Sequence, residues 1–164
     1  MPNGSHYEWL HLNEDNAKIL DFPRRVKIAL GIAKGLAWLH HCYELHVTHG
    51  SMSTRCILLD QNPKTKISNF WSSYKQDIYC FGVVLLEQLT GKEPHELTSS
   101  TTYLITLDGL ILQFLKLACK CVKFFPNERP TMLEVYDILK NISQGRRDWI
   151  QKVPLSTDIS SLYD

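Results

Sequence analysis

A run of apolar side chains over residues 74–89 leaves almost no polar face if it is coiled into a helix. A helix that is apolar on all sides must be surrounded by protein, so this segment is expected to lie at the centre of the domain. A buried strand over residues 83–86 is the alternative interpretation, because a short apolar run fits both structures. The length of the run, the Gly91 that follows it and the capping residues Ser72 and Ser73 before it favour a helix.

Three further segments show helical periodicity. An N-cap residue, Asp21, precedes a helix over about residues 22–41, whose two apolar stripes indicate burial on most sides. Residues 110–122 form an amphipathic helix, and Thr131 and Glu134 have the spacing of a capping box at the start of another. These segments predict a mainly α fold.

Residues 49–71 are the one part of the chain whose pattern predicts a compact β element. An apolar run at residues 56–59 and a short extended piece at residues 66–68 flank a cluster of turn-forming residues at 60–63, which together indicate a hairpin. Because loops around such a hairpin collect polar groups, it is the first place to look for a functional site.

Length and composition limit the alternatives. The 164 residues suffice for one domain and hardly for two, and the formal net charge of +1 argues against a broad surface for nucleic acid or an anionic membrane. No signal peptide and no membrane-spanning run is found, and the odd count of five cysteines indicates reduced thiols, so a cytoplasmic location is expected. We expect one domain over residues 1–143 and a mobile tail over residues 144–164, which has few apolar anchors.

Several short sequence motifs carry a specific resemblance to a known family: MPNGS, KIALGIAKGLAWLHH, DIYCFGVVLLEQLTGKEP, FLKLACKCV and NERPTMLEVYDIL. Together with the order of the predicted elements, they resemble the C-terminal lobe of protein kinases, and in particular plant leucine-rich-repeat receptor-like kinases. The word STRCILL is similar to a subgroup of pseudokinases that regulate immune and hormone co-receptors. The resemblance covers about residues 1–143 with one large gap, and it implies a helical bundle around a central buried helix with one small β-hairpin.

The resemblance places the family's catalytic positions on residues of different chemistry. His49 aligns with the His of the kinase catalytic loop, Ser51 with its catalytic Asp and Ser53 with its Lys. Cys56 falls on the metal-binding Asn, and Asn69 on the Asp of the Asp-Phe-Gly motif. A hydroxyl is too weak a general base, and Mg²⁺ prefers hard oxygen ligands to a thiol. The resemblance therefore implies no intact catalytic residue, no metal site and no bound ATP or Mg²⁺, although the family uses both.

Other aligned positions have structural roles in the family and keep their residue types. Asp77 aligns with the Asp that opens the central helix and binds the backbone of the catalytic loop. His49 and Phe70 align with two positions of an internal apolar column, and Leu58 aligns with the floor of the adenine pocket, of which it would be a remnant. Gln88 departs from the family, which has an apolar residue at that position, and the sequence does not say what it pairs with.

Two parts of a complete kinase domain have no counterpart in the sequence. MPNGS aligns just after the hinge between the kinase lobes, so the N-lobe is expected to be absent, and only residues 72–76 stand where a kinase has its activation segment. Arg129 aligns with an Arg whose usual Glu partner lies in that segment. If Arg129 is buried without a partner, the broken pair costs about 3–5 kcal/mol, so a marginally stable chain is expected.

Three clusters suggest other chemistry. A dense group of histidines with one cysteine could suggest zinc, but its spacing fits no closed structural site: His40, His41, Cys42, His46 and His49. Arg24, Arg25 and Lys27 could form an anion-binding patch, but a solvated helix face is the simpler interpretation. Cys119 and Cys121 are interpreted as core thiols.

Three functional hypotheses remain open at this point. The first is a catalytically inactive kinase-like fragment that acts through protein–protein interaction in receptor signalling, with a receptor-like kinase or co-receptor as partner. The second is a working serine/threonine kinase that binds ATP and phosphorylates proteins. The third is a gene fragment without a selected function, which shares every residue-level feature with the first.

Overall fold

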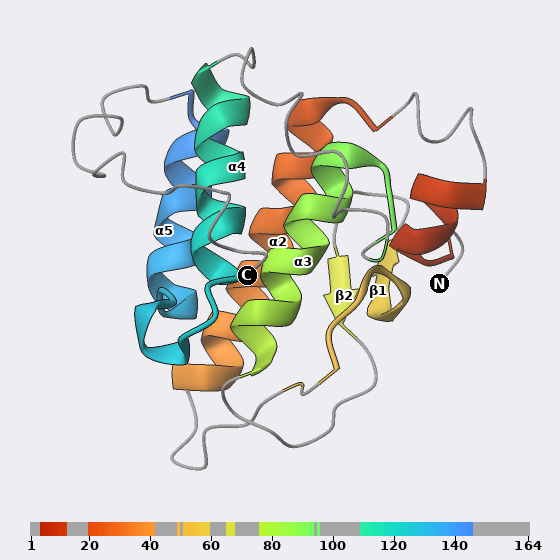
Figure 1. Ribbon diagram of the computed structural model, residues 1–164. Coiled ribbons are helices and arrows are strands. Elements are labelled where there is room, and N and C mark those ends of the chain that lie inside the picture. Colours follow the sequence, from red (N-terminus) through yellow and green to blue (C-terminus); the bar gives the residue numbers. More distant parts are fainter. Residues whose placement is uncertain are drawn as a thin grey trace.

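The computed structural model describes residues 4–12, 20–41, 49, 51–59, 65–67, 76–93, 95 and 109–145, and these form a mainly helical fold with one small sheet (Figure 1). In chain order the elements are η1 (Glu8–Leu12), α2 (Phe22–His41), η2 (Thr54–Cys56), β1 (Ile57–Leu59), β2 (Thr65–Ile67), α3 (Gln76–Thr90), α4 (Gly109–Cys121), η5 (Pro126–Glu128) and α5 (Met132–Ser143). The predicted mainly α fold with one hairpin is confirmed. The predicted tail lies almost wholly outside the described residues.

The central helix predicted from the sequence is α3. Its side chains Phe81, Val84 and Leu85 are buried, and α3 packs against α4 and α2 (Figure 1). The helix ends at Thr90, and Gly91 follows it with a φ of 66°, the left-handed turn common after helix C-termini. The strand alternative for residues 83–86 is therefore wrong, while the predicted capping serines lie outside the described part of the chain.

Helices α2 and α5 pack against each other, and each begins at a capping residue that the sequence predicts. The Asp21 carboxylate accepts a hydrogen bond from the backbone N–H of Arg24 at 3.0 Å, which caps α2. At the start of α5, Thr131 Oγ1 accepts from the Glu134 N–H at 3.3 Å, and Glu134 Oε2 accepts from the Thr131 N–H at 2.7 Å. These hydrogen bonds lower the pKa of Glu134. The predicted N-cap and capping box are both confirmed.

The hairpin lies against α2 through two glycines. Strands β1 and β2 are antiparallel, and Leu59 lies opposite Thr65. The second strand covers residues 65–67, so it begins one residue before the extended piece predicted at residues 66–68. A Cβ atom on Gly31 would lie 2.2 Å from Thr65 Oγ1, and one on Gly35 would lie 3.0 Å from Ile67 Cδ1. The spacing of four residues puts both glycines on one face of α2, which lets β2 approach closely.

Buried sulfur and aromatic groups fill the space around α4. Cys119 and Cys121 are buried, and burial raises the pKa of both thiols, so they are inert core side chains as predicted. Near the other end of α4, the rings of Phe114 and Phe22 meet edge to face with their centroids 5.7 Å apart, which ties α4 to the start of α2. None of the four cysteines in the described residues forms a disulfide.

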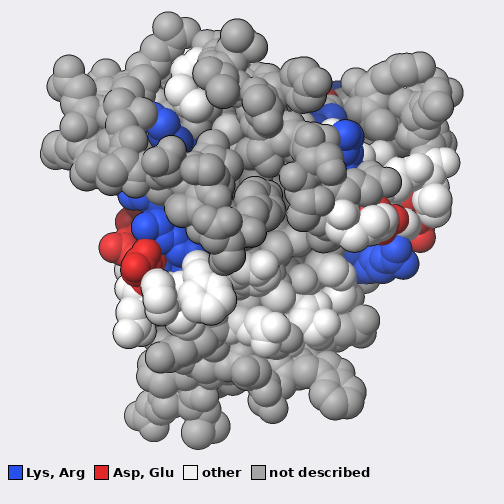
Figure 2. Space-filling view, viewed as in Figure 1, with Lys and Arg blue, Asp and Glu red and all other residues white. Residues whose placement is uncertain are grey.

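The face drawn in Figure 2 shows no dominant charge among the described residues. On the face drawn in Figure 2, basic and acidic side chains of the described residues appear together at the two flanks and do not gather in one patch. Within the same residues, no helix is both long enough and apolar enough to cross a bilayer.

Replacement of Gly82 by Ala should destabilise the fold, because α3 and α4 touch at this residue. The added Cβ would lie 2.6 Å from Cys121 Cβ and 2.7 Å from Val122 Cγ1, so the end of α4 must move. We expect the free energy of unfolding in a urea titration to fall by about 1–3 kcal/mol. Gly109→Ala is the matched control, because nothing lies within 4 Å of its added Cβ; an equal loss in both variants would contradict the packing argument.

Candidate functional site

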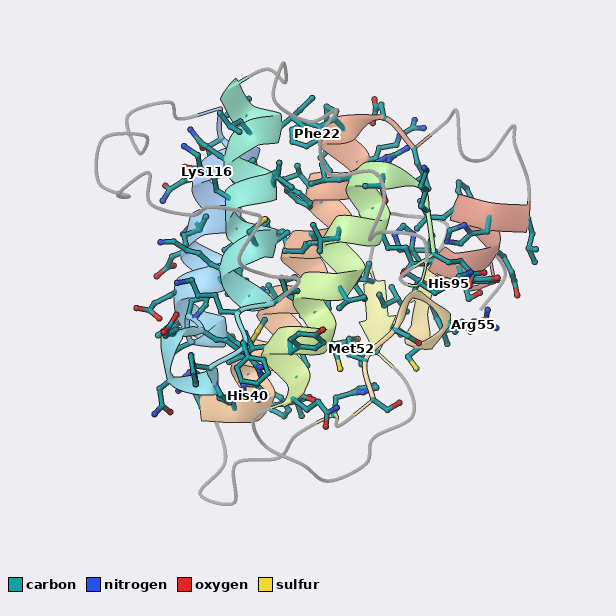
Figure 3. The ribbon with its side chains drawn as sticks, viewed as in Figure 1. Phe22, His40, Met52, Arg55, His95 and Lys116 are labelled. Carbon is teal, nitrogen blue, oxygen red and sulfur yellow. The ribbon has the colours of Figure 1, made fainter. Side chains whose placement is uncertain are left out.

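The first part of the predicted site segment (residues 49–71) is described at residues 49 and 51–59, and it is fixed at its start by a carboxylate on the first turn of α3. His49 is buried, and its backbone N–H donates to Asp77 Oδ2 at 2.6 Å. The same oxygen lies 3.0 Å from Nε2 of His40, which Figure 3 places at the C-terminal end of α2. One fully buried carboxylate thus joins α2, α3 and the loop, and the structure places Asp77 against the loop backbone.

A second carboxylate of α3 holds the loop further along. Glu87 is buried, and its Oε1 accepts a hydrogen bond from Thr54 Oγ1 at 2.8 Å and lies 2.7 Å from Nε2 of His11 on η1. Neither Thr54 nor Glu87 is among the site residues predicted from the sequence. The sequence does hold a signal for Glu87, because it is a charged residue in a helix with almost no polar face, and a buried carboxylate is rare unless it is paired.

Between these two anchors, three of the altered catalytic positions lie within reach of one another. Cys56 Sγ donates to the backbone carbonyl of Ser51 at 3.5 Å and lies 3.5 Å from Ser53 Oγ. Ser51 is exposed, and the other two are half-buried. The fourth altered position, Asn69, lies with Phe70 outside the described residues, so the structure does not place it relative to the loop.

Phosphoryl transfer in protein kinases depends on a carboxylate base and on oxygen ligands for Mg²⁺. Residues 49–59 contain no Asp or Glu, so no side chain of the segment can serve as a carboxylate base or as an anionic Mg²⁺ ligand. The altered positions Ser51, Ser53 and Cys56 carry two hydroxyls and a thiol, and Mg²⁺ disfavours soft sulfur. Asp77 and Glu87 direct oxygens to His49 and Thr54. The described residues of this loop therefore do not fit a magnesium–nucleotide site.

The histidine-rich cluster also gives no metal centre in the part of the chain that is described. There, no group of three or more His, Cys, Asp or Glu side chains could hold a metal ion. His40 and His49 both contact Asp77 instead. Cys42 and His46 lie outside the described residues.

Leu58, aligned with the floor of the adenine pocket, is half-buried in the middle of β1. On one side it pairs with Lys66 of β2, and on the other it forms an isolated antiparallel bridge with Ser5. The position is thus covered along its strand edge by the N-terminal segment of the same chain.

Arg129 is not a buried cation without partners, which was the possibility that the sequence raised. It is half-buried, its Nε donates to the Lys123 carbonyl at 2.7 Å, and its Nη2 donates to the Phe124 carbonyl at 3.1 Å. Its guanidinium carbon also lies 5.0 Å from the ring centroid of Tyr79. Both carbonyls lie in the segment that follows α4, so Arg129 ties this segment to the chain that leads into α5.

The three basic residues near the start of α2 do not all lie on a solvated face, which corrects the simpler interpretation. Arg24 and Lys27 are exposed, but Arg25 is half-buried. Its Nε donates to the Leu20 carbonyl at 2.6 Å, and its Nη1 donates to the carbonyl of Gln88 at the end of α3. The guanidinium therefore connects α2 to the central helix.

Substitution of Asp77 by Asn should loosen the loop and destabilise the fold. The amide loses the charge that the His49 N–H and His40 share, and a hydrogen bond to a charged group contributes about 1.5–3 kcal/mol. We expect a loss of about 2–3 kcal/mol in chemical denaturation, together with faster exchange of the His49 amide. Asp137→Asn, at an exposed position of α5, is the control and should change stability by less than about 0.5 kcal/mol. Similar values for both variants would contradict the anchoring role.

No protein-family model matches the chain. Among curated proteins, an Arabidopsis thaliana protein named "Probable inactive receptor kinase" is 32% identical over 87% of this chain and 34% of its own length. A leucine-rich repeat receptor-like protein kinase of the same plant, whose name also qualifies it as inactive, is 32% identical over 88% of this chain and 35% of its own length. A third Arabidopsis protein, named a probable leucine-rich repeat receptor-like protein kinase, is 34% identical over 99% of this chain and 19% of its own length.

The chain spans about a third of the length of the first two of these relatives. The first alignment extends over 205 positions, whereas this chain has 164 residues. That relative therefore carries residues inside the aligned region that this chain lacks.

Proposed function

Because this chain is a homologue of the plant leucine-rich-repeat receptor-like kinases, within the protein kinase superfamily, we propose that it is a kinase-like domain without phosphoryl-transfer activity that works by binding other proteins. It takes no ATP and no Mg²⁺. Its partner is a receptor-like kinase or a co-receptor, and it meets that partner in the cytoplasm.

The observation that carries this proposal is the composition of the anchored loop. The contacts of Asp77 and Glu87 hold the loop in place, while Ser51 and Cys56 occupy the aligned positions of the base and the metal ligand. A missing general base alone typically costs about 10²–10⁴-fold in rate. A loop that keeps its supports and lacks its reactive groups is suited to a scaffold and unsuited to a catalyst.

Two further observations support the proposal. Names of two relatives qualify those proteins as inactive kinases, so loss of activity is compatible with this family. The residues missing inside the aligned region agree with the short stretch at residues 72–76, where the family has its activation segment. Without that segment the chain has no platform for a peptide substrate.

A thermal-shift titration with Mg·ATP tests the loss of nucleotide binding. A ligand that binds only the folded state raises the stability by RT ln(1 + [L]/Kd), so a working site would give a saturable rise in melting temperature. We expect no rise up to millimolar nucleotide, while an active receptor kinase domain in the same buffer serves as the positive control. A saturable shift for this chain would establish the working-kinase alternative.

Binding of a partner is tested separately, with purified proteins. The chain is titrated by calorimetry against the cytoplasmic kinase domains of several plant leucine-rich-repeat receptor kinases. We expect saturable binding to at least one of them, unchanged by the addition of Mg·ATP because no nucleotide site takes part. Absence of binding across the panel, with a chain that unfolds cooperatively, would leave the gene-fragment hypothesis as the better account.

A further inference from the structure

The N-terminal segment, residues 4–12, lies along the edge of β1 that β2 leaves open. The Leu59 N–H donates to the Gly4 carbonyl at 3.1 Å, and Ser5 bridges Leu58 in antiparallel fashion. Figure 1 shows η1 beside β1, on the side away from α4 and α5. We call residues 4–12 the N-terminal strap, since they cover a strand edge that would otherwise present unpaired backbone groups.

The strap has a local structure of its own. The Ser5 N–H donates to Glu8 Oε2 at 3.2 Å, and the Glu8 N–H donates to Ser5 Oγ at 3.4 Å, which is a capping box that the sequence analysis overlooked. Gly4 precedes it with a φ of 68°, and a Cβ at Gly4 would lie 2.0 Å from Glu8 Oε2. These contacts form within the strap itself and do not depend on its contacts with β1 or α3.

A buried pair of polar side chains holds the strap to the central helix. His6 and Gln88 are both 0% exposed, and Gln88 Nε2 lies 2.9 Å from His6 Nε2. An amide nitrogen can only donate, so His6 Nε2 is the acceptor and the imidazole is neutral. This contact gives Gln88 its partner at a position where the resembled family has an apolar residue.

The charges around His6 oppose its protonation. Burial is the largest cause, and the positive Arg25 of α2 and His11 of the strap add to it, which together lower the pKa of His6 from 6.5 to about 4. The acidic group that α3 contributes beside the strap is Glu87, which is already engaged by His11 and Thr54.

The outer side of the strap carries its own charged contacts, which are more exposed. The Tyr7 hydroxyl donates to Glu93, and the Arg55 guanidinium lies 3.8 Å from the Tyr7 ring centroid. His95 Nδ1 lies 3.5 Å from a Glu93 carboxylate oxygen, and Figure 3 shows Arg55 and His95 along this edge. These groups are accessible to water, so their contacts are weaker than the buried pair.

We propose that the N-terminal strap is a cover that is released by acid. Neutral His6 holds the strap in place, and protonation of the His6 ring detaches residues 4–12 from α3. This detachment uncovers the edge of β1 at Leu58 and Leu59. A protonated His6 would place a positive charge near Arg25 and out of contact with water. Its Nε2–H would face the Gln88 N–H unless that amide turned, and the buried His6 Nδ1–H has no acceptor among the described residues. Release gives the ring back its hydration.

The direction of the pH effect follows from the two states of His6. The released strap binds a proton with the ordinary pKa of 6.5, and the docked strap binds it only near pH 4. Between these values the released state holds more protons, so docking weakens as the pH falls from 6.5 and stops weakening below about 4. At pH 5 the docking constant should be about 30-fold lower than at pH 7.5.

Amide hydrogen exchange of the whole chain, followed residue by residue by NMR and corrected for the intrinsic rate at each pH, tests the proposal. The Leu59 amide is a direct reporter because it donates to Gly4. We expect its protection to fall about 30-fold between pH 7.5 and 5.0, together with the protection of residues 6–12 and ahead of any loss in α5. Constant protection of Leu59 over this range would overturn the proposal.

Two variants separate His6 from the other acid-sensitive groups. The double variant His6→Leu, Gln88→Leu replaces the polar pair with apolar side chains, and its Leu59 protection should not change between pH 7.5 and 5.0. His95→Gln, at the exposed edge, is the control and should retain the wild-type response. An acid-induced loss of the same size in the double variant would show that another group is responsible.

If the double variant does not fold, the wild-type chain still decides the question through the NMR titration of the His6 ring protons. The proposal requires that the ring titrate well below pH 6.5 and that the strap amides lose protection over the same range. A His6 ring that titrates near 6.5, with no change in the strap amides, would contradict it.

Discussion

The structure depends on one buried carboxylate, that of Asp77. Taking a charge out of water is costly, and the cost is offset only when several donors surround the charge. Asp77 meets this condition because it lies in the first turn of α3, where the helix dipole favours an anion, and because His49 and His40 converge on one of its oxygens. The end of α2, the start of α3 and the loop are therefore fixed relative to one another at a single atom.

In this arrangement, the groups that hold the loop are distinct from the side chains at its aligned catalytic positions. The groups that hold the loop are a backbone N–H and a threonine hydroxyl, which meet carboxylates of the central helix. At the aligned catalytic positions, Cys56 donates to the Ser51 carbonyl and lies near the Ser53 hydroxyl. The hydrogen bonds that support the loop therefore use other groups than the side chains at the aligned catalytic positions.

The polar groups buried near the C-terminal end of α3 also hold elements of the fold together. An unpaired polar side chain in a core is costly, and a paired one fixes a single arrangement of the elements that carry it. The pair of His6 and Gln88 joins the N-terminal strap to α3, and Arg25 adds a bond from α2 to the same residue's carbonyl. Neither contact supplies chemistry to the loop. They determine where the N-terminal segment lies, and through it how the edge of β1 is covered.

The sequence by itself determined the elements and much of their orientation. The apolar stretch in α3, the N-cap Asp21, the capping box of Thr131 and the turn residues of the hairpin are all local signals, and a local signal is complete within a few residues. The identity of the side chains in the loop is also given directly by the sequence. Only the tertiary structure decided which polar groups meet. Gln88 pairs with a residue 82 positions away and Glu87 with one 33 positions away. Such partners are set by how the helices pack, and no local pattern in the sequence indicates a pairing between residues so far apart along the chain.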